Sequence, residues 1–100
     1  LKQAHTMKSN TRAFLFLSVA LGKEEEIAKK LLNYDEVKEV HIVPGEWDIL
    51  AVLEIRRNML VSDSEAVTKL VTEKIMTING IKDTNTMIGT SSRTKFSDSI

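Results

Sequence analysis

The sequence has no cysteine, a single proline and only 5% aromatic residues. The lack of cysteine excludes disulfides, thiolate nucleophiles and cysteine-rich zinc sites, so packing must hold the fold together. No surplus of one charge exists either, because 14 Lys and Arg balance 14 Asp and Glu. Proteins that grip nucleic acid through its phosphates usually carry a basic surplus, so we expect no direct nucleic-acid binding.

Long hydrophobic runs are also absent. No stretch approaches the roughly 18 apolar residues of a membrane span, and the polar N-terminus does not have the form of a signal peptide. A cytoplasmic protein without membrane contact is therefore the default prediction.

The remaining composition is that of one soluble globular domain, with 100 residues of which 42% are hydrophobic. Residues 1–12 are polar and aperiodic, and we expect them to be a disordered or cloning-derived segment. In the second case Met7 would be the native start, preceded by residues left by cloning. We place the folded, ligand-binding domain at residues 13–90 and a flexible tail at residues 91–100.

The first half of the domain changes from strand to helix and back to strand. Residues 13–21 form a nearly unbroken apolar run, typical of a central strand. In residues 23–33 the apolar side chains fall on one helical face, behind three glutamates at the positive end of the helix dipole. Residues 37–43 and 47–55 are predicted to form a hairpin, with Pro44 and Gly45 between its strands.

The second half repeats the strand-helix-strand arrangement. Ser62, followed three residues later by Glu65, predicts the start of a helix, which Asn79 and Gly80 should close. Residues 81–90 alternate as a last strand. Two such halves joined by a hairpin predict an α+β, ferredoxin-like βαββαβ fold, a four-stranded antiparallel sheet with both helices on one face.

The other face of this sheet is predicted to be too hydrophobic to remain in water. Phe14, Phe16, Val19 and Trp47 supply more apolar surface than two helices can hide, so we expect a second subunit to cover it. Burial of Trp47 in that interface is a simpler expectation than stacking on a ligand.

Two motifs carry a resemblance to a known family. The first is the segment YDEVKEVHIVPGEWDIL, with Val37, Gly45, Trp47 and Asp48 at characteristic spacing, and the second runs from Gly80 and Ile81 to Thr84 and Thr86. With the apolar first strand, they resemble the C-terminal effector-binding domain of the Lrp/AsnC regulators, also called the RAM domain and related to the ACT domain. The chain has no room for the family's helix-turn-helix, so it resembles the stand-alone form.

The resemblance implies an amino-acid effector bound between subunits near the turn after the second strand, by Gly45, Glu46, Asp48, Thr84 and Thr86. Glycine permits close backbone approach, threonines offer hydroxyls to a carboxylate, and an acidic side chain suits an ammonium group. It further implies dimers through the sheets, higher homo-oligomers, and full-length Lrp-like regulators as partners.

Simpler explanations exist for each of these residues. Gly45 suits a turn that needs positive φ, Asp48 can bond the turn that it leaves, and Thr84 and Thr86 favour strands in any protein.

Other functions have less support in the sequence. An enzyme of the dimeric α+β barrel type would use His41, Trp47 or Asp48 on an organic substrate, but no nucleophilic set, phosphate-binding loop or cofactor motif accompanies them. A lone His41 does not make a metal site. An RNA-binding sheet would need basic and glycine positions that the first and third strands lack. We therefore predict a binding domain, with no catalytic residues, metal or cofactor.

Overall fold

The order of strands and helices is the one expected from the sequence. The computed structural model describes residues 10–57, 60–93 and 95. Within them, the elements are β1 (Asn10–Val19), α2 (Glu24–Leu31), β2 (Val37–Ile42), β3 (Ile49–Arg56), α3 (Asp63–Glu73), the 3-10 helix η1 (Ile75–Thr77) and β4 (Ile81–Ile88).

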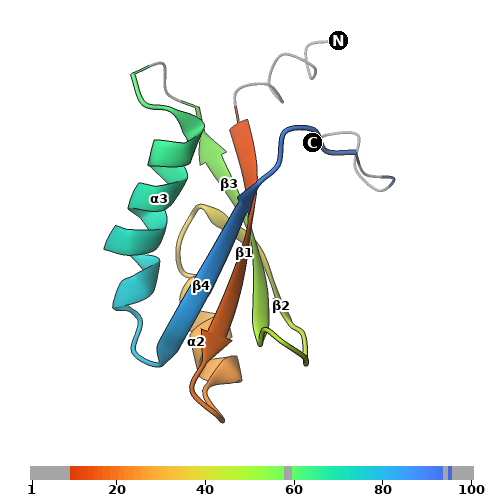
Figure 1. The fold of residues 1–100 in the computed structure, drawn as a ribbon, viewed down its shortest axis with the longest axis vertical. Helices are drawn as coiled ribbons and strands as arrows, with labels where there is room; N and C mark the ends of the chain where they lie inside the picture. The colour runs from red at the N-terminus through yellow and green to blue at the C-terminus, as the bar shows by residue number, and fades with distance from the viewer. Residues whose placement is uncertain (1–9, 58–59, 94, 96–100) are drawn as a thin grey trace.

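The strands form one sheet in the order β2-β3-β1-β4, and all neighbours are antiparallel. The two most apolar strands, β1 and β3, occupy its centre, where neighbours cover both of their edges. Figure 1 shows α3 running along the sheet and α2 near its lower end. The predicted ferredoxin-like βαββαβ fold is confirmed.

Alternation along the strands divides the sheet into two faces. Every second residue of β1, from Thr11 to Val19, is buried, and side chains paired across an antiparallel sheet share a face. These β1 residues pack with alternate residues of the other strands and with both helices. The buried core is Ala13, Leu15, Leu17, Val19, Ile27, Leu31, Val37, Ile49, Ala51, Leu53, Val67, Leu70, Val71, Ile75 and Ile78.

Local signals in the sequence account for the helices. In α2, Ile27 and Leu31 are four residues apart and both are fully buried. In α3, the hydroxyl of Ser62 accepts a hydrogen bond from the backbone N–H of Glu65 at 3.1 Å, which confirms the expected start.

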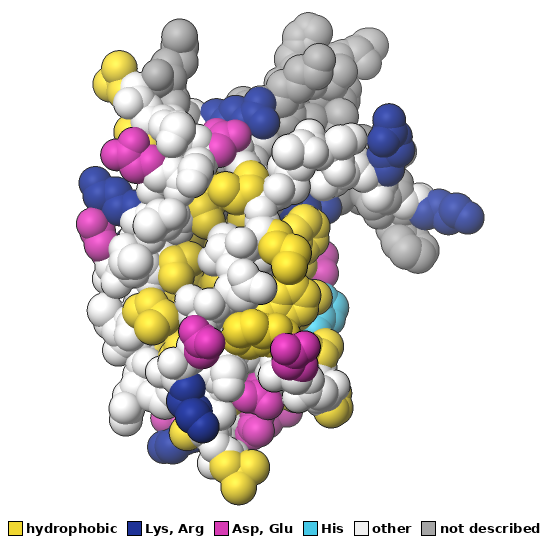
Figure 2. Space-filling view, viewed as in Figure 1, with side chains coloured by type: hydrophobic (Ala, Val, Ile, Leu, Met, Phe, Trp, Pro, Cys, Tyr) yellow, Lys and Arg dark blue, Asp and Glu magenta, His cyan; other side chains and the backbone are white. Residues whose placement is uncertain are grey.

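The opposite side of the sheet carries the remaining residues of the central strands. We call it the open face and define it by residues that pair across the strands: Phe14, Phe16, Leu50, Val52 and Met87. Trp47 lies against Phe16, with ring centroids 6.3 Å apart. Figure 2 shows hydrophobic side chains gathered over β1 and β4. No described helix covers this face, as the sequence predicted.

The start of β1 differs from the prediction. The strand begins at Asn10 instead of Ala13, because Asn10 to Arg12 pair with Arg56 to Glu54 of β3 and Arg12 forms a 2.7 Å ion pair with Glu54. Placing residues 10–12 in the N-terminal segment was therefore wrong. Residues 1–9 lie outside the described part, as do residues 94 and 96–100 of the expected tail.

The end of β1 and the end of the second helix also differ. β1 stops at Val19, and Leu21, expected in the strand, lies in the following turn with 97% of its surface exposed. The helix α3 ends at Glu73 instead of near Gly80, because the 3-10 turn η1 is needed to bring Ile75 and then Ile78 into the core. Gly80 follows with a φ of 105°.

Candidate functional site

The turn between β2 and β3 is built by residues that cannot continue the strands. Pro44 has no N–H to donate to the sheet, and Gly45 has a φ of 142°, which residues with a side chain rarely adopt. The backbone N–H of Val43 donates to the carbonyl of Asp48 at 2.9 Å and closes the turn. The positive φ predicted for Gly45 is confirmed.

Asp48 attaches this turn to β1. Its backbone N–H donates to the carbonyl of Leu17 at 2.9 Å, and its Oδ2 accepts a hydrogen bond from the backbone N–H of Val19 at 2.8 Å. The carboxylate therefore bonds the neighbouring strand, instead of the turn that it leaves.

The first turn of α2 lies beside the β2–β3 turn. This arrangement follows from the topology. β1 leads into α2 at the same end of the sheet at which the antiparallel β3 begins. Glu24 and Glu25 start the helix, and its N-cap residue Lys23 makes no side-chain cap. Neither glutamate forms an ion pair with a described residue, whereas Glu26 pairs with Lys30 at 3.3 Å.

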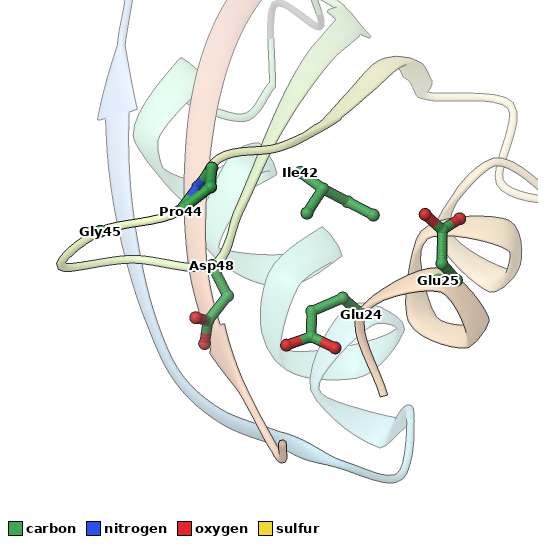
Figure 3. A pocket seen from close by; sticks show the side chains of 6 residues that line it. All are labelled: Glu24, Glu25, Ile42, Pro44, Gly45 and Asp48. Carbon is green, nitrogen blue, oxygen red and sulfur yellow. The ribbon is translucent and has the colours of Figure 1, made fainter. Parts of the chain in front are cut away.

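An open pocket of about 410 Å³ lies between these two turns. Its lining residues are Glu24, Glu25, Ile42, Pro44, Gly45 and Asp48. In Figure 3, Glu24 extends from the start of α2 into the space below the turn, and Asp48 lies across from it with its carboxylate turned toward β1. The volume is within the range of small-molecule sites.

The chemistry of the pocket is acidic with an apolar part. Three of its lining residues are acids and none is basic, while Ile42, which is 40% exposed, and Pro44 offer apolar surface. Such a surface suits a small ligand with an ammonium group and an apolar portion. Across the described residues, no group of three or more His, Cys, Asp or Glu side chains is arranged to hold a metal ion.

The predicted binding residues separate into two sets. Gly45 and Asp48 line the pocket, and Glu46 belongs to the same turn but is exposed and does not line it. Thr84 and Thr86 lie on β4, at the far edge of the sheet from β2.

The register shows how far apart these sets are. Thr84 pairs with Leu17, which pairs with Ile49, which pairs with the pocket residue Ile42. Three strand spacings, roughly 14 Å, therefore separate the backbones of Ile42 and Thr84. Both threonines share the helix-facing side with Leu15 and Leu17, so one subunit does not bring the two motifs together.

Four pocket residues were missed by sequence reasoning: Glu24, Glu25, Ile42 and Pro44. The glutamates were explained by the helix dipole alone. The predicted topology already placed the start of the first helix and the hairpin turn at one end of the sheet, and that signal was sufficient to find them.

His41 and Trp47 lie outside the pocket. The Nε2 of His41 is 2.9 Å from Oε1 of Glu39, and its side chain is 52% exposed at the edge of the open face. A deep cavity enclosing His41 would have favoured an enzyme, and this position gives that interpretation no support. No helix within the described part of the chain is long and apolar enough to cross a membrane.

Comparison with known proteins gives consistent results. Residues 12–97 match a family model described as the Lrp/AsnC ligand binding domain. An uncharacterised HTH-type transcriptional regulator of Pyrococcus furiosus is 42% identical over 65 residues, which are 65% of this chain and 39% of that protein. The chain thus spans about two fifths of the length of this relative.

Two solved structures share the fold. AsnC of E. coli superposes with a TM-score of 0.76 at 20% identity, covering 96% of this chain and 61% of that one. A transcriptional regulator of Neisseria meningitidis, solved as a complex with L-Met, superposes with a TM-score of 0.70 at 19% identity, covering 96% and 59%.

Proposed function

Because this chain belongs to the Lrp/AsnC ligand-binding domain family, as its motifs predicted, we propose that it is a regulatory effector-binding domain whose effector is an amino acid. The observation that carries the proposal is the pocket between the β2–β3 turn and the first turn of α2. The neisserial relative was solved with L-Met, which supports an amino acid as the class of effector.

The proposed ligand fits the pocket by charge and by polarity. Its ammonium group would face the carboxylates of Glu24 and Glu25, which form no ion pair with a described residue and are therefore available. Its side chain would lie against Ile42 and Pro44. A charge-assisted hydrogen bond of this kind contributes about 1.5–3 kcal/mol.

The ligand carboxylate needs donors that the acidic wall does not provide. Backbone N–H groups of the turn around Gly45 are one source in the same subunit. We propose that the hydroxyls of Thr84 and Thr86 are a second source, contributed by a neighbouring subunit, because in their own subunit two strands separate them from the pocket residue Ile42. The effector would then bind between subunits.

We propose that the open face is where two subunits meet. It presents Phe14, Phe16, Leu50 and Met87 in adjacent rows around the buried Val52, and Met87 is 53% exposed. Covering such a surface with an identical copy removes apolar area from water without needing another protein. Dimers of this type would assemble further and would also accept full-length regulators of the same family.

The segment carries 14 basic and 14 acidic residues, so its own surface has no surplus for binding DNA. We propose that its part in transcriptional regulation is to bind the effector and neighbouring subunits, with DNA contact made by other parts of the assembly.

Thermal unfolding with each of the twenty amino acids tests the effector. A ligand at 100 times its dissociation constant should stabilise the protein by about 2.7 kcal/mol. Glu24→Gln with Glu25→Gln should weaken binding about 10- to 100-fold, since charge-assisted bonds are lost. The matched control is Glu73→Gln, an exposed glutamate at the end of α3. No response to any amino acid, or undiminished binding by the double variant, would overturn the proposal.

A further inference from the structure

Asp48 closes the turn of the pocket and attaches it to β1. Its carbonyl accepts from Val43 at 2.9 Å, and its N–H donates to Leu17 at 2.9 Å. Its Oδ2 accepts from the N–H of Val19 at 2.8 Å. Only the last of these bonds uses the side chain, so it is the one that a substitution removes.

The bond to Val19 pairs a backbone N–H of β1 that has no partner in β3. The β1–β3 pairing ends with Leu17 opposite Ile49, but β1 continues to Val19. The N–H of Val19 points to the same side as the carbonyl of Leu17, past the end of β3, where no strand carbonyl remains. Val19 is only 5% exposed, and a buried N–H without an acceptor is unfavourable. The carboxylate of Asp48 takes the place of the missing carbonyl.

We propose that Asp48 is a positioning residue of the pocket. Through Val19 it holds the β2–β3 turn against the end of β1, and this task requires an acceptor oxygen at that place, not a negative charge. The direct partner of a ligand ammonium is then Glu24, which faces Asp48 across the pocket in Figure 3 and has no described ion pair. Only this assignment to Glu24 rests on the proposed function; the link through Val19 does not.

The experiment compares Asp48→Asn with Asp48→Ala in the full chain. Asparagine keeps an acceptor oxygen and loses the charge, whereas alanine loses both. Asp35→Asn and Asp35→Ala are the matched controls, because Asp35 is exposed and its side chain makes no hydrogen bond with a described residue.

The first readout needs no ligand. Amide hydrogen exchange at Val19, followed by NMR, should become at least about tenfold faster in Asp48→Ala and remain near the wild-type rate in Asp48→Asn and both controls. The amide signals of Gly45 and Glu46 should shift in the alanine variant and stay in place in the asparagine variant. Unchanged exchange at Val19 in Asp48→Ala overturns the proposal. If the alanine variant does not fold, loss of Val19 protection in Asp48→Asn overturns it instead.

The second readout is thermal stabilisation of the same variants by each of the twenty amino acids. Asp48→Asn should keep the wild-type response, whereas Glu24→Gln should reduce it. An asparagine variant that loses the response while Val19 stays protected would show that the charge itself contacts the ligand, which refutes the positioning role. If the wild type responds to no amino acid, the proposed function fails, while Val19 exchange still decides the role of Asp48.

Discussion

Met87 offers a sharp test of the dimer proposed through the open face. It lies on the edge strand β4 opposite Phe14, and 53% of it is exposed. Met87→Ala should therefore cost the isolated subunit only about 0.7–1.4 kcal/mol, since the side chain is only about half buried within it. In the dimer the same side chain would be covered.

The size of the effect follows from that exposed fraction. Burying a methionine side chain completely is worth about 1.5–3 kcal/mol, so covering the exposed half is worth about 0.8–1.5 kcal/mol. A symmetric dimer contains the residue twice, which gives about 1.5–3 kcal/mol for the interface. The dimer dissociation constant should therefore rise about 10- to 100-fold.

Sedimentation velocity over a dilution series measures this constant. The control is Met76→Ala, which truncates a methionine of similar exposure, 41%, on η1 in the helix layer. It should sediment as the wild type does. Equal dissociation constants for the two variants, or a wild type that stays monomeric at high concentration, would refute the proposed interface.

Three further predictions concern the subunit itself. Leu15→Ala removes a fully buried side chain from the centre of β1 and should lower the free energy of unfolding, measured by urea titration, by about 3 kcal/mol. A loss below about 1 kcal/mol would contradict the burial of Leu15 in the core. Gly45→Ala should lower the free energy of unfolding by about 1–3 kcal/mol, because the φ of 142° at this position is strained for a residue with a side chain. The added Cβ would meet no atom within 4 Å, so backbone strain is the only expected cost. Unchanged stability would mean that the turn adopts another conformation. The hydrogen bond from Lys30 and the charge of Lys23 hold the pKa of Glu26 below its ordinary value of 4.5. The stability that comes from a lowered carboxyl pKa is present above pH 4.5 and is lost as the pH falls, so the free energy of unfolding of the wild type should exceed that of Glu26→Gln near neutral pH but not in acid. An NMR titration midpoint of Glu26 at or above 4.5 would contradict the ion pair.

Much of the fold was predictable because its signals are local. The period-2 alternation of β1, the helical spacing of Ile27 and Leu31, and the Ser62 cap each depend on residues within a few positions of one another. The errors lay at the ends of elements, where long-range contacts decide. β1 starts at Asn10 because β3 provides partners there, which the polar composition of residues 10–12 did not indicate.

The candidate site was only half predictable for the same reason. Gly45 and Asp48 were found because the turn they form is continuous in sequence. Glu24 belongs to a different element, and only the packing of α2 beside the hairpin places it opposite Asp48. The family motif grouped Thr84 and Thr86 with Gly45 and Asp48. In the sheet, however, the central strands β3 and β1 separate β4, which carries the two threonines, from β2.

By itself the sequence determined the order of the elements, the side of each strand that enters the core, and the turn at Pro44 and Gly45, because these follow from side-chain periodicity and backbone sterics. Only the tertiary structure decided which distant residues meet, because strand order and register are set by the packing of the whole sheet. The bond from Asp48 to Val19 joins residues that no local pattern connects.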